Sequence, residues 1–136
     1  MDRDALQEFL RQAFPQVAQD FTVEEVAPHR IAVRMPSTEK TLRPGGTVSG
    51  PAMFALADVS VYLALLAMIG PKALAVTTNA SIDFLRKPVA GVDLLSECRL
   101  LKLGRVLAVG DVLLRSEGQD APVARASLTY SIPPER

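Results

Sequence analysis

The sequence has few of the residue types on which common catalytic and metal sites depend. Its 136 residues include one cysteine, one histidine and no tryptophan. The single cysteine, Cys98, excludes an internal disulfide and a thiolate cluster, and it fits a reducing, cytoplasmic compartment. The single histidine, His29, lies at the edge of an early predicted strand, so we expect no serine–histidine–acid triad. Since zinc-protease and phosphate-loop motifs are also missing, we predict no metal and no cofactor.

Neither sign of charge is in excess. Fifteen lysines and arginines balance fifteen aspartates and glutamates, for a formal net charge of zero. This balance provides no electrostatic footprint for nucleic acid or an anionic membrane, so we expect neither as a partner. The start of the chain, MDRDALQEFL, does not have the basic segment and apolar run of an export signal. We therefore expect a cytoplasmic protein.

One long hydrophobic run is present, PAMFALADVSVYLALLAMI between Gly50 and Gly70, and Asp58 is its only charged residue. A run of this length could span a bilayer. A carboxylate in mid-run would cost roughly 2.5–3.5 kcal/mol there, which favours a buried helix in a soluble fold. Because the helix is apolar on all sides, we expect the rest of the domain to enclose it.

Much of the remaining chain alternates between apolar and polar residues, as strands do. An amphipathic helix over residues 2–14, ended by Pro15, is predicted first. The predicted strands then span about 22–27, 29–36, 73–84, 92–103, 105–116 and 122–132. Turn residues at Gly104 and at 117–120 join the last three strands as hairpins. The sequence predicts one α+β domain, residues 1–136, in which a curved, largely antiparallel sheet of five or six strands wraps the long helix.

A glycine-rich loop, residues 43–49, leads into the long helix. Free backbone N–H groups and the positive end of the helix at Gly50 favour an anionic oxygen, which makes Gly50 a candidate oxyanion hole. The alternative is a tight turn that needs its glycines. Asp58 is a candidate catalytic acid because an ionisable group in an apolar helix must be satisfied or used. The alternative for Asp58 is a buried carboxylate satisfied by neighbouring hydroxyls, for example those of Ser60 or Tyr62 from a partner protomer.

The segment SGPAMFALAD, which holds Gly50 and Asp58, and the later segment SIDFLRKP resemble the hotdog-fold acyl-CoA thioesterases of the phenylacetate-pathway type. The resemblance runs from about Arg43 to the C-terminus. It implies that the N–H of Gly50 polarises a thioester carbonyl and that Asp58 activates water or attacks directly. It further implies a homodimer or a dimer of dimers, with coenzyme A as part of the substrate rather than a cofactor.

The spacing of Gly50 and Asp58 adds a geometric argument. Eight residues of helix rise about 12 Å. A general base must come within about 3 Å, or one water, of the group it activates. One chain therefore cannot offer both residues to one thioester carbon, and we expect a site that pairs Gly50 of one protomer with Asp58 of its two-fold mate.

In relatives of this type, the strand after the helix often carries a hydroxyl residue, which holds the attacking water. Thr77 and Thr78 both lie there, and alternation along the strand slightly favours Thr78 as the residue that faces the helix. The alternative is that both threonines are present only for their strand propensity. Many relatives have a histidine where this chain has Ser49, and several have an asparagine where it has Arg43. Arg43, Thr47 or the hydroxyl of Ser49 are candidates to compensate.

Cationic and apolar residues complete the candidate set. Four cations are either contacts for coenzyme A phosphates or ordinary solvated residues: Arg86, Lys87, Lys102 and Arg105. Pro51 and Phe54, at the helix start, are candidates for substrate contact. Met53, Leu56 and Leu63 also suit an acyl pocket, but a helix core requires the same residues. A non-catalytic acyl-CoA or acyl-carrier binding module, and a structural dimer without ligand, remain the alternatives to an enzyme.

Overall fold

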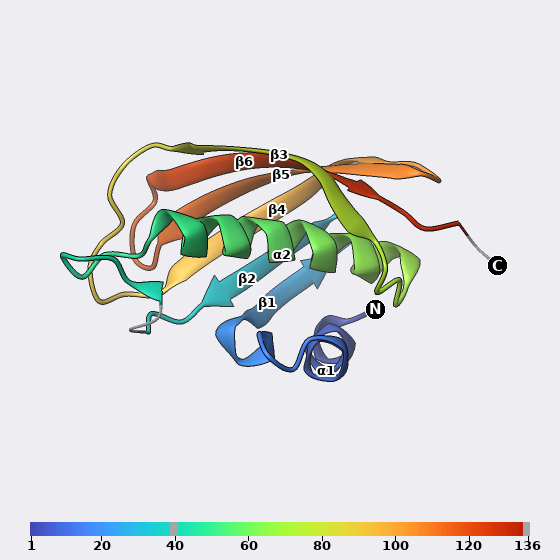
Figure 1. Ribbon diagram of the computed structural model, residues 1–136, viewed down its shortest axis with the longest axis horizontal. Helices are drawn as coiled ribbons and strands as arrows, with labels where there is room; N and C mark the ends of the chain where they lie inside the picture. The colour runs from blue at the N-terminus through green and yellow to red at the C-terminus, as the bar shows by residue number, and fades with distance from the viewer. Residues whose placement is uncertain (39–40, 135–136) are drawn as a thin grey trace.

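The computed structural model describes residues 1–38 and 41–134, and it has one long helix lying across a six-stranded sheet (Figure 1). That helix, α2, spans Gly50–Ile69. The strands are β1 (Thr22–Ala27), β2 (Arg30–Met35), β3 (Val76–Phe84), β4 (Leu94–Leu103), β5 (Leu107–Ser116) and β6 (Pro122–Ser131). Their order is β1-β2-β4-β5-β6-β3, and every neighbouring pair is antiparallel. The predicted hotdog fold is confirmed.

Alternation and turn chemistry produce the strands where the sequence predicts them. In β6, Ala124, Leu128 and Tyr130 are buried against the helix, whereas Arg125 and Ser127 between them are exposed. The β4–β5 turn closes with a hydrogen bond from the amide of Gly104. These local signals suffice because an antiparallel hairpin is made from neighbouring segments.

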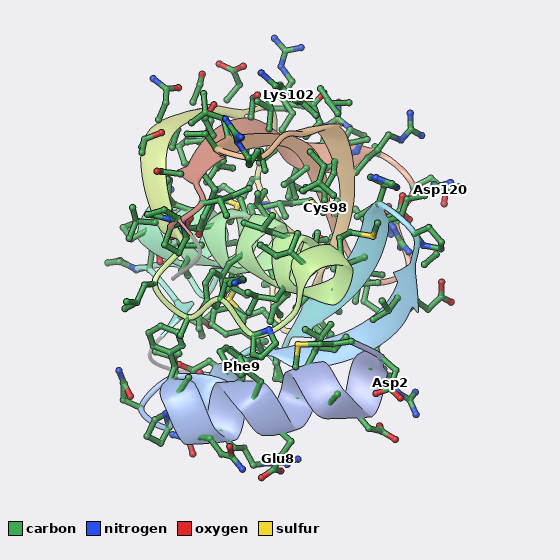
Figure 2. All side chains as sticks on the ribbon, turned by 90° about the vertical axis from the view of Figure 1, so that its right-hand side faces the viewer. Asp2, Glu8, Phe9, Cys98, Lys102 and Asp120 are labelled. Carbon is green, nitrogen blue, oxygen red and sulfur yellow. The ribbon has the colours of Figure 1, made fainter. Side chains whose placement is uncertain are left out.

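The first helix, α1 (Arg3–Ala13), is a packing element. Asp2 caps it by accepting a hydrogen bond from the amide of Ala5 at 2.8 Å. Leu6 and Leu10 are fully buried. Figure 2 shows Glu8 pointing away from the molecule while Phe9, on the opposite side of α1, lies toward the core. The predicted amphipathic helix is therefore present and faces as expected.

Enclosure of α2 is only partly as expected. Residues 60–66 are all buried, and the hydroxyl of Ser60 lies 2.6 Å from that of Ser96 in β4, which ties the helix to the sheet. The first half of the helix keeps an open side. The exposed residues there are Pro51, Phe54 and Ala55. Full enclosure by one chain is thus wrong, because the curved sheet covers the first half of α2 from one side only.

By length and composition α2 could also cross a membrane, with a hydropathy of 2.1 over 18 residues. Of that window, 56% is buried inside the fold. Packing inside the fold therefore accounts for the apolar residues of the buried part of α2, as in the core helix of a soluble protein.

Candidate active site

The loop before α2 is a tight hairpin that delivers the chain to the helix start. The amide of Arg43 donates to the carbonyl of Thr47 at 2.8 Å, and the amide of Gly46 donates to the carbonyl of Arg43 at 3.0 Å. Gly45 and Gly46 have φ of 102° and 80°, a left-handed conformation that favours glycine. The side chain of Arg43 is exposed, whereas Thr47 is buried.

The first turn of α2 leaves one amide without an acceptor. Ser49 is the N-cap, and its Oγ accepts the amide of Ala52 at 3.2 Å while its carbonyl accepts the amide of Met53 at 3.0 Å. Pro51 has no N–H. Among the described residues, the amide of Gly50 has no acceptor. Since it lies at the positive end of the helix, this N–H can receive an anionic oxygen.

Turn geometry does not account for Gly50 as it does for Gly45 and Gly46. Gly50 does not have a positive φ. A Cβ built on Gly50 would lie 3.4 Å from the ring of Phe84, an ordinary contact distance. Alanine would therefore fit within one chain and would favour the helix. A turn that needs its glycines therefore explains Gly45 and Gly46, but it does not explain Gly50.

Asp58 lies half-buried in α2, with one carboxylate oxygen held and the other open. Its Oδ1 accepts the hydroxyl of Thr77 at 2.7 Å and that of Tyr130 at 2.6 Å. Its Oδ2 accepts no hydrogen bond from the described residues. No side-chain nitrogen or oxygen of the described residues is buried without a hydrogen-bond partner, so Oδ2 is not buried. Oδ2 therefore reaches solvent. The hydroxyls that hold Asp58 come from the same chain and are not those of Ser60 or Tyr62.

A β-bulge decides which threonine faces Asp58. The pairing of β3 with β6 shifts between Thr77 and Asn79, so Thr78 is an extra residue without a partner in β6. Residues before this bulge therefore face the opposite side from the one that alternation counted back from the end of β3 would give. Thr77 thereby lies on the inner face, opposite Tyr130. Thr78 is exposed, and its hydroxyl donates to the carbonyl of Thr129 at 3.3 Å. The preference of the sequence for Thr78 as the inward residue is wrong, because strict alternation does not hold across a bulge.

Tyr130 is the site residue that the sequence reasoning missed. It is only 4% exposed, and its hydroxyl also lies 3.2 Å from the main-chain oxygen of Asp58. Burial, followed by the negative charge of Asp58, raises the pKa of Tyr130 well above its ordinary value. The alternation of β6 placed this tyrosine on the inner face, and a buried tyrosine hydroxyl needs a partner. The sequence therefore indicates that the hydroxyl of Tyr130 has a partner, but it does not indicate that the partner is Asp58.

The four cationic candidates divide between two ends of the sheet. Arg86 and Lys87 follow β3, near the start of α2, where the ring of Phe84 would lie 3.4 Å from a Cβ built on Gly50. Lys102 and Arg105 flank the β4–β5 turn at the opposite end, beyond the end of α2 (Figure 1). All four are exposed, and Lys102 lies at the top of the sheet in Figure 2. One chain does not bring the two pairs together.

The apolar candidates separate by exposure. Phe54 is 38% exposed and Pro51 is exposed beside it, so both are accessible from outside the chain. Met53, Leu56 and Leu63 are at most 5% exposed and belong to the helix core.

The remaining reactive side chains lie outside this site. His29 is exposed in the β1–β2 turn. Cys98 is buried, and burial, followed by the charge of Asp111, raises the pKa of its thiol to about 12. Among the described residues, no group of three histidine, cysteine, aspartate or glutamate side chains could hold a metal ion.

Comparison with known proteins points to one family. The family model of the thioesterase superfamily matches residues 45–123. A search of the curated proteins finds no significant match. A crystal structure from Silicibacter sp., provisionally named a thioesterase, is 60% identical, with a TM-score of 0.93 over 98% of this chain and 93% of that chain.

Two further structures are more distant. A mutant of the phenylacetic acid degradation protein PaaI from Thermus thermophilus is 26% identical, with a TM-score of 0.74 over 88% of this chain and 99% of that chain. A hypothetical thioesterase from Streptococcus pneumoniae, solved with coenzyme A, is 20% identical, with a TM-score of 0.76 over 98% of each chain. At that identity the likeness shows the fold alone.

Proposed function

This chain belongs to the thioesterase superfamily, and from that premise we propose that it hydrolyses an acyl-CoA thioester at a site shared by two copies of the chain. The observation that carries the proposal is the half-held carboxylate of Asp58, whose Oδ2 is open beside the exposed side of α2. The coenzyme A in the Streptococcus structure supports acyl-CoA as the substrate class. Cytoplasm is the compartment we propose.

A homodimer would complete the site. Gly50 and Asp58 lie on one continuous helix, eight residues and about 12 Å apart, so a single chain does not place them together. β3 is an edge strand that leaves Val76 and Phe84 more than half exposed. Apolar edges of this kind pair with another chain. A two-fold copy against β3 would cover the open side of α2 and bring Asp58 to the Gly50 of its mate, in a dimer or a dimer of dimers.

The chemistry would divide between the two protomers. The N–H of Gly50 in one protomer donates to the thioester carbonyl and stabilises the oxyanion that forms. Oδ2 of Asp58 in the other takes a proton from water while the water oxygen attacks the carbonyl carbon. The tetrahedral intermediate then expels coenzyme A as a thiolate, which takes up a proton. Alternatively, Oδ2 attacks the carbon directly and the carbon–sulfur bond breaks, which releases coenzyme A as a thiolate and leaves a mixed anhydride with Asp58. Water then hydrolyses this anhydride to the free acid and the carboxylate of Asp58, and the thiolate takes up a proton released in that step.

Thr77 would orient the attacking water in the first of these routes. The proton of its hydroxyl is donated to Asp58 at 2.7 Å, so toward water its oxygen can only accept. A water that donates one hydrogen to Thr77 Oγ1 and the other to Asp58 Oδ2 turns a lone pair toward the substrate. This arrangement gives a threonine at this position a reason beyond strand propensity.

The remaining candidates would bind substrate. Pro51 and Phe54 offer apolar contact to the acyl group from the open side of α2. The exposed cations are proposed contacts for coenzyme A phosphates, and in a dimer the two pairs can come from different protomers. Ser49 directly precedes Gly50, and its hydroxyl accepts the amide of Ala52, so the hydroxyl proton can still be donated to a substrate. Arg43 and Thr47 are paired with each other in the loop that leads into α2 and remain candidates to compensate for the residues of the relatives.

Thiol release from a panel of acyl-CoAs, by wild type and by Asp58→Asn, tests the function. Asparagine keeps the shape but removes the base, so kcat should fall by about a hundredfold or more. Asp83→Asn is the matched control, because Asp83 pairs with Arg125 on the exposed surface and should leave kcat within about twofold. Equal rates for wild type and Asp58→Asn would exclude Asp58 as the catalyst. Tight binding without turnover by wild type would support a binding module.

A further inference from the structure

Two strands hold a single oxygen of the Asp58 carboxylate. Tyr130 in β6 donates to Oδ1 at 2.6 Å, and Thr77 in β3 donates to the same atom at 2.7 Å. The two donors are direct partners in the antiparallel ladder between β3 and β6. Their spacing is therefore set by the backbone pairing of the sheet.

We propose that Tyr130 is a positioning residue, which acts with Thr77 to hold the carboxylate of Asp58 so that Oδ2 alone faces the substrate. The inference rests on the proposed function, because it assigns Tyr130 a part in the same hydrolysis. We do not expect Tyr130 itself to touch the substrate, since it is only 4% exposed and belongs to the hydrophobic core.

The need for a second donor follows from the freedom of an aspartate side chain. The terminal torsion of aspartate is broad and roughly two-fold, so one hydrogen bond to Oδ1 leaves the carboxylate plane free to turn. Two donors from different strands restrict that rotation and define where Oδ2 points. A misplaced base lowers the rate of the chemical step more than it lowers substrate affinity, because binding uses other contacts.

Tyr130 is well suited to this role. Burial and the charge of Asp58 raise its pKa far above the working range, so the hydroxyl keeps its proton and always donates. Its ring lies 6.0 Å from that of Tyr62, which in turn lies 5.7 Å from that of Phe14. This row of rings restrains the tyrosine, and a restrained donor holds its acceptor more firmly than a mobile one.

The chain offers a matched control in Tyr62. Tyr62 is 5% exposed, close to the 4% of Tyr130, and its hydroxyl donates to the carbonyl of Ala73 at 3.1 Å. It bonds neither Asp58 nor Thr77. Tyr62→Phe therefore removes a buried hydroxyl next to Tyr130 without removing a donor from the carboxylate.

Steady-state kinetics on the acyl-CoA that wild type hydrolyses best test the inference. For Tyr130→Phe we expect kcat to fall by about tenfold to a hundredfold, with KM within about twofold, because a hydrogen bond to a charged group is lost. Tyr62→Phe should keep the kcat of wild type. An unchanged kcat in Tyr130→Phe, or an equal fall in both variants, would overturn the inference.

A crystal structure of Tyr130→Phe supplies a readout that does not depend on turnover. A carboxylate of Asp58 that is rotated, or present in several orientations, supports the inference. A carboxylate that keeps its orientation, with Thr77 as its one donor, overturns it. Wild type that hydrolyses no acyl-CoA would instead refute the proposed function, and the two failures are thus distinguishable.

Discussion

A site built from two protomers can be tested by subunit complementation. One variant, Asp58→Asn, lacks the base. The other, Gly50→Pro, lacks the amide that the first turn of α2 leaves unclaimed. Proline is favoured at the first helical position, and Ser49 before it has a ψ of 157°, which suits a residue that precedes proline. The helix is therefore expected to form in both variants.

The expected activities follow from the geometry. Loss of an oxyanion donor costs about 10²- to 10³-fold in kcat, and loss of the base about 10²- to 10⁴-fold, so each homodimer should retain about 1% of wild-type activity or less. In a mixed dimer, one site has both defects. The other pairs the intact Gly50 of the Asp58→Asn chain with the intact Asp58 of the Gly50→Pro chain. A purified heterodimer should therefore show about half of the wild-type rate.

The assay co-expresses the two variants with different tags, purifies the doubly tagged dimer, and measures thiol release. The recovered site needs a working Asp58 from the Gly50→Pro chain, so its activity also shows that this chain is folded. Gly50→Ala adds a second comparison, since it keeps the N–H and places its Cβ 3.4 Å from the ring of Phe84. Its kcat should lie above that of Gly50→Pro.

The refuting result is a pure heterodimer no more active than its parents. If Gly50 and Asp58 of the same chain served one site, every mixed dimer would carry one defect in each site, and no recovery could occur. An active monomer at assay concentration would also exclude a site shared by two protomers, because α2 keeps Gly50 and Asp58 about 12 Å apart along its axis.

Two further predictions concern the threonine pair and acid stability. Thr77→Val should lower kcat by about tenfold or more, because it removes a donor to Asp58. Thr78→Val, which removes a donor only to the carbonyl of Thr129, should keep kcat within about twofold of wild type. The reverse order in the thiol-release assay would show that Thr77 is not the threonine that faces Asp58. The amide of Ser37 and the guanidinium of Arg34 hold the pKa of Asp93 below its ordinary 3.8, so its stabilisation is present above about pH 4 and is lost as pH falls through the lower folded pKa. Asp93→Asn should lower the free energy of unfolding by about 1–2 kcal/mol at neutral pH, and the gap to wild type in denaturant titrations should close in acid; a gap independent of pH would contradict this assignment.

The open side of α2 is where composition and structure disagreed. A helix apolar on every face predicts burial, and residues 60–66 are buried as expected. Pro51 and Phe54 in its first half are not covered by the chain's own sheet. The hydrophobicity of a residue indicates that it is favourably buried, but it does not indicate whether its own chain or a partner chain buries it.

The amino-acid sequence was enough to predict the helices and strands of this protein and to identify Gly50 and Asp58 as the centre of its candidate site. Helical runs, strand alternation and turns depend on neighbours within a few residues, so they can be recognised from the order of residues alone. The same holds for Gly50 and Asp58, because eight residues of one helix set their separation. In contrast, the contacts of Thr77 and Tyr130 with Asp58 became evident only from the packed strands. The bulge arises from the pairing of β3 with β6, and Tyr130 reaches Asp58 across 72 positions of the chain, so both depend on a strand register that no local pattern encodes.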